Sequence, residues 1–542
     1  MDLKQSRTGR EDATYPSRPE RGLLLVLASL LCSAASGCAH GPQGIAMGSR
    51  GRITKGPCLL RLYQDRAALM WETDTESPWG VYYGKKGKLD THFESVAEKV
   101  VPGGPTDGGP KTVYIHKVWI EGLKPGQAYH YRIVGSGVRS DAYEFRTVPL
   151  ETDEVRFIVY GDSRTQVDVH RRLVEQMMKH DVAFIVNGGD LVSRGDEYRQ
   201  WGPQFFEPLK GLMERVPIYI AKGNHEGQNG TYERLLVPPG EENDFTIDYG
   251  PLHYFCADNV SRRLDDDRII PQITRAAADG ARWKFVSYHV PSVNFGGHWS
   301  DWRQREALSA FADAGIDFVV AGHSHQYERF RPIEPAGKGQ HVTYITAGGG
   351  GAPLYDVEPT IYHACAKTAY HFCVFHIKGD TLVMDTIDID GRIIDHLEVT
   401  KSEGRLNKQY LWTAVPVGGI QLHQRLHENL DVVLSEVPEK DRPFTVNIRM
   451  TLPPLSNEAR LTFELRGDPD AYRLPEPCRV TVPEAGGPVR AELTVTPRVA
   501  VDPPTGRPGR ASPLSPTLRL DCRYELGRID EIVSHPVAIR GR

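Results

Sequence analysis

The side chains best suited to chemistry in this sequence lie in five short polar clusters. The clusters are Gly161-Asp162, Gly189-Asp190, Gly223-Asn224-His225-Glu226, His289 and Gly322-His323-Ser324-His325. Carboxylate and amide oxygens are hard ligands, imidazole is a borderline ligand, and this mixture suits Fe, Mn or Zn. If the fold brings the clusters together, the sequence predicts a metal site.

The elements that must position these clusters are buried strands. Each cluster follows a short apolar run rich in β-branched and aromatic residues, which is typical of a buried strand. The runs are 155–160, 183–186, 217–220, 283–286 and 316–320. Helix-like segments are expected at 167–179 and 301–313, and the alternation of strands and helices predicts an α/β sheet. Ligand sites of such sheets collect at the carboxyl ends of the strands, where all five clusters lie.

Each cluster taken alone has a simpler explanation. A Gly-Asp pair after a strand is commonly a turn or a helix N-cap, so Asp162 alone does not indicate a ligand. A single histidine such as His289 is more often a hydrogen-bonded core residue, and His-x-His alone is a weak metal signal. The joint occurrence of all five clusters in a matching strand context favours one shared metal site.

In this order the motifs resemble those of the calcineurin-type metallophosphoesterases and, among them, the purple acid phosphatases. That family's pattern is Gly-Asp-x-Gly, Gly-Asp-x-x-Tyr, Gly-Asn-His-Asp/Glu, Val-x-x-His and Gly-His-x-His. This chain has Gly161-Asp162-Ser163-Arg164, Gly189-Asp190-Leu191-Val192-Ser193, Gly223-Asn224-His225-Glu226, Val286-Ser287-Tyr288-His289 and Gly322-His323-Ser324-His325, continued by Gln326-Tyr327-Glu328-Arg329. The resemblance covers residues 50–400.

The resemblance implies a pair of metal ions with Asp190 as the bridging ligand. One ion would be held by Asp190, Asn224, His289 and His323, and the other by Asp162, Asp190 and His325. Two departures affect the second set, because Ser193 stands where purple acid phosphatases have a tyrosine ligand, and Arg164 stands where other metallophosphoesterases have a histidine. We therefore expect two divalent or mixed metal ions (Fe, Mn or Zn), the second bound more weakly.

The activity that the resemblance implies is hydrolysis of small phosphate esters by a metal-bound hydroxide, as in an acid phosphatase acting on monoesters. His225 would stabilise the transition state or protonate the leaving oxygen, and His298 is either a second candidate for that work or a surface loop histidine. Arg164 would hold a phosphate oxygen, or only fix Asp162 by a salt bridge. The alternatives are a phosphodiesterase, or a lipoprotein with decayed catalysis that still binds metal and phosphate. The persistence of Asp190 and His225 favours the enzyme.

The resemblance also implies the architecture of residues 50–400, an α/β fold, and strand-like segments beyond them indicate one more part. A fibronectin III-like β-sandwich is expected at 50–150, a metallophosphoesterase β-sandwich flanked by helices at 151–400, and a β-rich domain of unknown role at 402–542. Edge hairpins at 370–400 should finish the catalytic sheet. The glycine run 348–351 lacks the context of a nucleotide loop and predicts tight backbone packing near the site. Cys478 and Cys522 are a candidate disulfide pair.

The amino-terminal segment predicts export. Residues 23–35 form an apolar run too short to span a bilayer and typical of a signal peptide. Ala35-Ser36-Gly37-Cys38 resembles a bacterial lipobox, so 1–37 would be a lipoprotein-type signal peptide and Cys38 the lipid anchor; the alternative is an ordinary secretory peptide. We expect an exported bacterial lipoprotein, anchored in the periplasm or at the cell surface. With a net charge of −5 and no basic patch, nucleic acid is not an expected partner.

Overall fold

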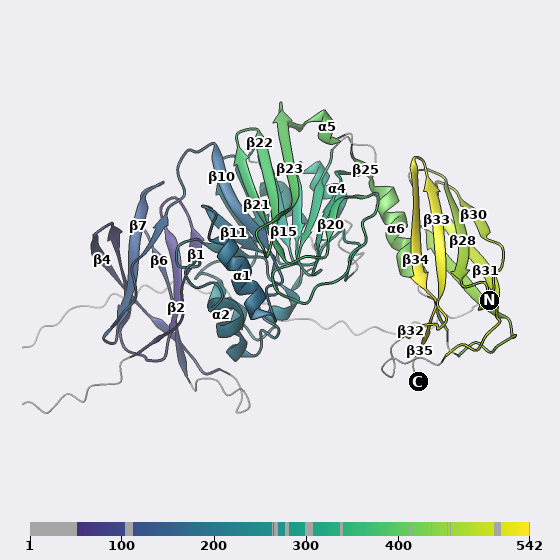
Figure 1. The fold of residues 1–542 in the computed structure, drawn as a ribbon. Coiled ribbons are helices and arrows are strands. Elements are labelled where there is room, and N and C mark those ends of the chain that lie inside the picture. Colours follow the sequence, from purple (N-terminus) through teal and green to yellow (C-terminus); the bar gives the residue numbers. More distant parts are fainter. Residues whose placement is uncertain are drawn as a thin grey trace, which may run out of the picture. The chain divides into compact units, whose positions relative to one another are not determined.

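The computed structural model describes most of the chain after residue 50 (Figure 1). The described residues are 51–102, 112–262, 264, 269–276, 281–298, 307–335, 340–411, 413–430, 432–434, 436–452, 454–455, 457–502 and 511–540. The predicted signal peptide and Cys38 lie outside them. Within the described ranges, no helix is both long and apolar enough to cross a membrane.

The first part is a sandwich of two antiparallel sheets. One sheet has the order β1 (Ile53–Leu62), β2 (Ala67–Thr73), β6 (Val113–Ile120), β5 (Ala97–Val100). The other has the order β4 (Lys88–Ser95), β3 (Trp79–Lys85), β7 (Ala128–Gly135), β8 (Val138–Arg139), with β9 (Tyr143–Arg146) also paired to β7. Trp71 of β2, Trp79 of β3 and Ile133 of β7 are buried in one core shared by the two sheets. The two-sheet β domain was predicted; its fibronectin-like character stays a prediction.

The central part is a second sandwich, built from two seven-stranded sheets. The first sheet runs β12 (Ile218–Ile220), β11 (Phe184–Asn187), β10 (Glu154–Tyr160), β21 (His371–Lys378), β22 (Thr381–Asp388), β23 (Ile393–Ser402), β24 (Arg405–Leu406). The second runs β13 (Phe245–Tyr249), β14 (Leu252–Cys256), β15 (Trp283–Tyr288), β16 (Phe318–Ala321), β19 (Thr343–Ala347), β17 (Tyr327–Phe330), β20 (His363–Lys367). Strands β10, β11 and β12 are parallel, as are β14, β15, β16 and β19.

The core between these two sheets is aromatic. Phe157 of β10 packs edge-on against Phe285 of β15, with ring centroids 5.5 Å apart. On the outer face of the first sheet, Ile158 belongs to a different core together with Leu173 of α1 (Val167–Met177) (Figure 1). Successive residues of the strand, such as Phe157 and Ile158, thus face two different cores. The strands carry unbroken apolar runs because both of their faces are covered.

The other α-helices in the described residues are shorter than α1 except for α6, which has 13 residues. They are α2 (Thr231–Leu236), α3 (Ile269–Ala276), α4 (Ala307–Asp313), α5 (Lys408–Leu411) and α6 (Val417–Asn429). Phe311 of α4 packs with Tyr288 on the outer face of the second sheet. The helix expected at 167–179 is α1, and the one expected at 301–313 is α4 in its described half, since 299–306 lie outside the described residues. The α/β class, with a β-sandwich flanked by helices, is confirmed.

The carboxyl-terminal part is rich in strands, as predicted. One sheet has the order β27 (Phe444–Leu452), β31 (Gly487–Pro497), β29 (Tyr472–Arg473), and a second has β30 (Cys478–Val482), β28 (Ala459–Gly467), β33 (Leu518–Leu526), β34 (Ile529–Pro536). Small sheets join β26 (Val433–Leu434), β35 (Ala538–Arg540) and β32 (Ala511–Pro513), and β18 (Ile333–Glu334) with β25 (Val415–Pro416).

The register of this part shows that the predicted Cys478–Cys522 disulfide is wrong. Phe463 of β28 pairs with Cys478 on one side and with Cys522 on the other. Two strand spacings of about 4.8 Å therefore separate the cysteines, which exceeds the Cα–Cα reach of a disulfide, about 7 Å. Both cysteines are free thiols.

Candidate metal centre

The six predicted ligands converge where strands of the two catalytic sheets end. Asp162, Asp190 and Asn224 follow β10, β11 and β12 of the first sheet. His289 follows β15, and His323 and His325 follow β16, all in the second sheet. Each sheet thus supplies three of the six side chains.

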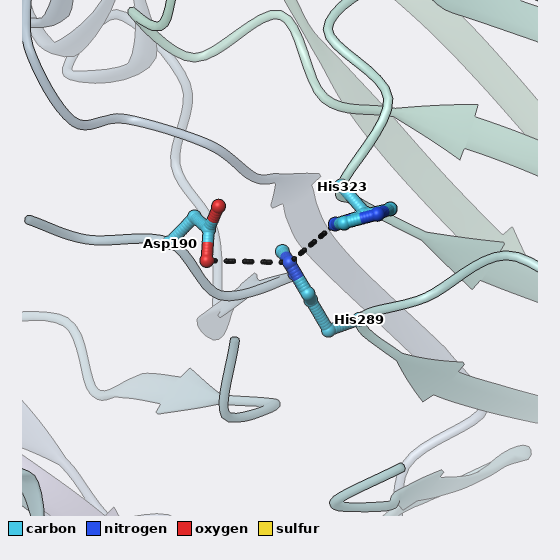
Figure 2. Close-up of side chains that lie close together, drawn as sticks. All are labelled: Asp190, His289 and His323. Carbon is cyan, nitrogen blue, oxygen red and sulfur yellow. Dashed lines mark hydrogen bonds and ion pairs between the residues drawn. The ribbon is translucent and has the colours of Figure 1, made fainter. Parts of the chain in front are cut away.

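Four of these side chains surround one point. His289 Nε2 lies 3.2 Å from Asp190 Oδ1 and 2.9 Å from Asn224 Oδ1. His323 Nδ1 lies 2.9 Å from the same asparagine oxygen and 3.2 Å from His289 Nε2. Figure 2 shows His289 between Asp190 and His323. Ligand atoms that are each about 2.0–2.2 Å from one ion are about 3 Å apart, so this spacing fits a metal ion.

Neighbouring carbonyl groups fix the histidine tautomers that a metal requires. His289 Nδ1 donates to the Gly188 carbonyl at 2.7 Å, and His325 Nδ1 donates to the Pro353 carbonyl at 2.8 Å. In both rings Nε2 is then left as the ligand atom. Burial lowers the pKa of His323 to about 3 and that of His325 to about 4, so both rings are neutral near pH 7.

The second cluster consists of Asp162, Asp190 and His325, whose ligand atoms lie within 4.8 Å of one another. Asp162 Oδ2 accepts the His323 backbone N–H at 2.8 Å, whereas the buried Oδ1 has no hydrogen-bond partner. Burial, and then the Asp190 carboxylate, raise the pKa of Asp162 well above its usual range. A buried acceptor without a partner is unfavourable, and a cation at this place would relieve it.

Arg164 reaches into this second cluster. Its Nε donates to Asp190 Oδ2 at 3.3 Å, and one terminal nitrogen lies 3.3 Å from His325 Nε2. Of the two roles expected for Arg164, the salt bridge is formed with Asp190 rather than with Asp162.

Ser193 does not replace the missing tyrosine. Its hydroxyl donates to Gln204 Oε1 at 3.0 Å and lies 3.1 Å from Thr165 Oγ1. These contacts hold the short side chain among polar neighbours of the loop. The second cluster keeps three protein ligands, as the sequence indicated.

The backbone at the ligands is unusual. Asp162, Asp190 and His323 have φ angles of +59°, +57° and +68°, in the left-handed region that residues with a Cβ rarely occupy. Tight packing accompanies this: a Cβ on Gly348 would lie 2.1 Å from the Ser324 carbonyl oxygen, and one on Gly350 would lie 2.3 Å from that of Gly161. The predicted close packing of the glycine run near the site is confirmed.

The two predicted catalytic histidines lie at the rim of the site. His225 donates its backbone N–H to Asp190 Oδ1 at 2.9 Å, and its Nδ1 donates to the Ser193 carbonyl at 2.6 Å. Its Nε2 lies 3.7 Å from Asp190 Oδ2, and about a third of the side chain, 31%, is exposed. The exposed His298 stacks on His323 with ring centroids 4.8 Å apart. It is therefore a residue of the site rather than a remote loop histidine.

Sequence reasoning missed two residues of the site. Glu226, which is buried, accepts the backbone N–H groups of Asp190, Leu191 and Gly223 at 3.0, 2.7 and 2.6 Å. Tyr355 stacks on His325 at 4.4 Å and shares a hydrogen bond with His298 at 3.0 Å. The glutamate belongs to a motif that was recognised, but nothing local marks its partners. Tyr355 has no sequence signal.

Two family models match the chain. Residues 155–327 match the calcineurin-like phosphoesterase model, and residues 61–147 match the purple acid phosphatase N-terminal domain. Fold, ligand clusters and the first match define the catalytic part as a calcineurin-like phosphoesterase domain.

The similar proteins are purple acid phosphatases. Purple acid phosphatase 21 of Arabidopsis thaliana is 30% identical over 264 residues, covering 44% of this chain and 58% of that protein. Probable inactive purple acid phosphatase 1 of the same plant is 24% identical over 351 residues, covering 52% of this chain and 57% of that protein. The chain thus spans somewhat more than half the length of these two relatives.

The same family appears among solved structures. Purple acid phosphatase PPD1 from seeds of yellow lupin (Lupinus luteus) shares the fold with a TM-score of 0.53 and 17% identity, covering 67% of this chain and 77% of that one. The chain contains a calcineurin-like phosphoesterase domain that follows a purple acid phosphatase N-terminal domain, and the proteins it resembles are purple acid phosphatases. That family uses a dinuclear metal centre, and the two clusters that share Asp190 are the candidate positions for it.

Proposed function

We propose that the chain hydrolyses small phosphate esters, in the first place monoesters, with a metal centre at Asp190. The observation that carries this proposal is the convergence of six ligand side chains on two clusters that share Asp190. Bound metal ions supply positive charge to the phosphate oxygens and lower the pKa of a bound water. Fe, Mn and Zn suit the ligand set.

The residues around the centre have separate tasks in this reaction. The Ser193 carbonyl holds His225 Nδ1, so Nε2 is the ring atom that can give a proton to the leaving oxygen. The guanidinium of Arg164 is aimed at the same cluster and supplies donors for a phosphate oxygen. His298 and Tyr355, joined by their hydrogen bond, border the site where a leaving group would lie.

The other candidate functions share the same ligands. A phosphodiesterase would use the same centre, and only substrates separate the two reactions. A binding protein with decayed catalysis would need the metal ligands but not His225, whose position beside Asp190 therefore favours the enzyme.

The test is Asp190→Ala measured with p-nitrophenyl phosphate and bis-p-nitrophenyl phosphate, together with metal content. The substitution removes a ligand from both clusters, so we expect loss of bound metal and of hydrolysis. Asp168→Ala, which removes an exposed carboxylate of α1, is the matched control and should leave both unchanged. Hydrolysis by pure Asp190→Ala protein at the wild-type rate contradicts the proposal. Faster cleavage of the diester by the wild type would select the phosphodiesterase.

We also propose that the protein is exported and anchored through Cys38. The lipobox-like Ala35-Ser36-Gly37-Cys38 after the apolar run 23–35 supports this. Mass spectrometry of the membrane fraction should find a lipid-modified Cys38 as the first residue. An unmodified cysteine or another mature terminus contradicts the anchor.

A further inference from the structure

The guanidinium of Arg164 is held at three points inside the second cluster. Nε donates to Asp190 Oδ2, and the two terminal nitrogens lie 3.3 Å from His325 Nε2 and from Thr165 Oγ1. The side chain is 14% exposed, so these contacts form largely out of water. Each contact is long for a charge-assisted hydrogen bond, and together they fix the guanidinium between Asp190 and His325.

Two of these three acceptors are the atoms that a second metal ion would need. The lone pair of His325 Nε2 points to Arg164, because Nδ1 of that ring donates to the Pro353 carbonyl. Asp190 Oδ1 faces His289 in the first cluster, so Oδ2 is the oxygen that remains for a second metal ion. A metal ion and the guanidinium therefore compete for the same pair of atoms.

From this geometry we infer that Arg164 is a built-in cation that occupies the second metal position. The resting protein then holds one metal ion, at Asp190, Asn224, His289 and His323, with the guanidinium beside it. A second ion enters only by displacing Arg164 from Asp190 and His325. The inference rests on the metal centre of the proposed function, but not on hydrolysis.

A simpler cause of a weak second position is the missing tyrosine at Ser193. The two explanations predict different affinities for the second metal ion once Arg164 is removed. If the lost ligand alone matters, removing Arg164 adds no ligand and leaves the second affinity unchanged. If the arginine competes, removing it strengthens the second equivalent although the variant offers no new donor.

The experiment is calorimetric titration of metal-stripped protein with Mn²⁺, for the wild type and for Arg164→Ala. We expect one tight equivalent in the wild type, and in Arg164→Ala a second equivalent strengthened by about 10–100-fold, the range over which one neighbouring group changes metal affinity. Arg164→Met keeps the bulk without charge or donors and should behave like the alanine variant. Arg171→Ala removes a half-exposed arginine of α1 and should match the wild type.

Electron paramagnetic resonance gives a second measurement that is independent of activity. Two Mn²⁺ ions about 3.5–4 Å apart are magnetically coupled, and a single ion is not. We expect an uncoupled spectrum from the wild type at two equivalents and a coupled one from Arg164→Ala. Two tight equivalents with a coupled spectrum in the wild type, or no gain in either Arg164 variant, overturn the inference. One tight equivalent without hydrolysis would instead leave the inference standing and defeat the proposed function.

Discussion

Glu226 joins the metal-binding loops that follow β11 and β12, and we expect Glu226→Gln to weaken both the fold and the metal site. Oε2 accepts the backbone N–H groups of Asp190 and Gly223, and Oε1 accepts that of Leu191. An amide keeps two of these acceptor contacts, but its NH₂ group then faces the third N–H donor. One buried N–H left unsatisfied costs about 1–3 kcal/mol, and two bonds without charge assistance lose about 1 kcal/mol each, so the sum is about 3–5 kcal/mol.

The measurements are urea unfolding of the metal-stripped protein and Zn²⁺ affinity by competition with a chelator. Because the loops carry Asp190 and Asn224, Zn²⁺ binding should weaken by about 10–100-fold, as it does when an outer partner of a ligand is lost. Glu175→Gln, on the exposed face of α1, is the matched control. Burial, and then the Asp190 carboxylate, raise the pKa of Glu226 to about 8, so both measurements are made at pH 9, where the carboxylate is ionised. If Glu226→Gln unfolds and binds Zn²⁺ like the wild type, the carboxyl is protonated in the native protein and the argument from three N–H donors is refuted.

Three further predictions concern single side chains. His225→Ala should keep its metal content but lose about 10²–10⁴-fold in kcat, the loss expected for a general acid or transition-state partner, and loss of a metal equivalent would make His225 a ligand instead. Burial lowers the pKa of the His170 imidazole from 6.5 to about 4, so below pH 6.5 the unfolded chain binds a proton that the native ring does not bind. The contribution of His170 to the free energy of unfolding is therefore fully present above pH 6.5 and is lost as the pH drops towards 4. In urea titrations of metal-stripped protein, the free energy of unfolding should fall between pH 8 and pH 5 by about 2 kcal/mol less for His170→Asn than for the wild type. Equal falls would contradict the low pKa of His170. With Ser193 in place of the tyrosine ligand, protein loaded with ferric iron should lack the visible band that a tyrosinate gives and Ser193→Tyr should gain it; a strong band in the wild type would mean that another phenol, such as Tyr355, binds the iron.

The strands and the ligand clusters could be predicted because their signals are local. A buried strand and the polar residue at its end are adjacent in sequence, so Asp162 after β10 or His323 after β16 can be placed without knowing the fold. The N–H partners of Glu226 lie up to 36 residues away, and His298, which Tyr355 contacts, lies 57 residues from it, so these contacts depend on how loops far apart in the chain meet.

The errors have the same origin. A salt bridge from Arg164 to Asp162 is the natural expectation for residues two apart, but the side chain crosses to Asp190 on the neighbouring loop. Cys478 and Cys522 lie in one domain and were expected to form a pair, but the strand register places β28 between them. Sequence patterns along the chain predict where the strands lie. Which residues are neighbours across a sheet depends on strand pairing, which only the structure shows.

The left-handed backbone of Asp162, Asp190 and His323 has an energetic cost at the candidate metal ligands. A left-handed residue with a Cβ is disfavoured by about 1–2 kcal/mol, although aspartate and histidine tolerate it better than most. Glycine would adopt the same φ without that penalty, but it would also remove the acceptor of the His323 N–H at Asp162 and that of the His225 N–H at Asp190. The fold therefore accepts a backbone cost at three neighbouring candidate ligands, and the contacts of their side chains offset it.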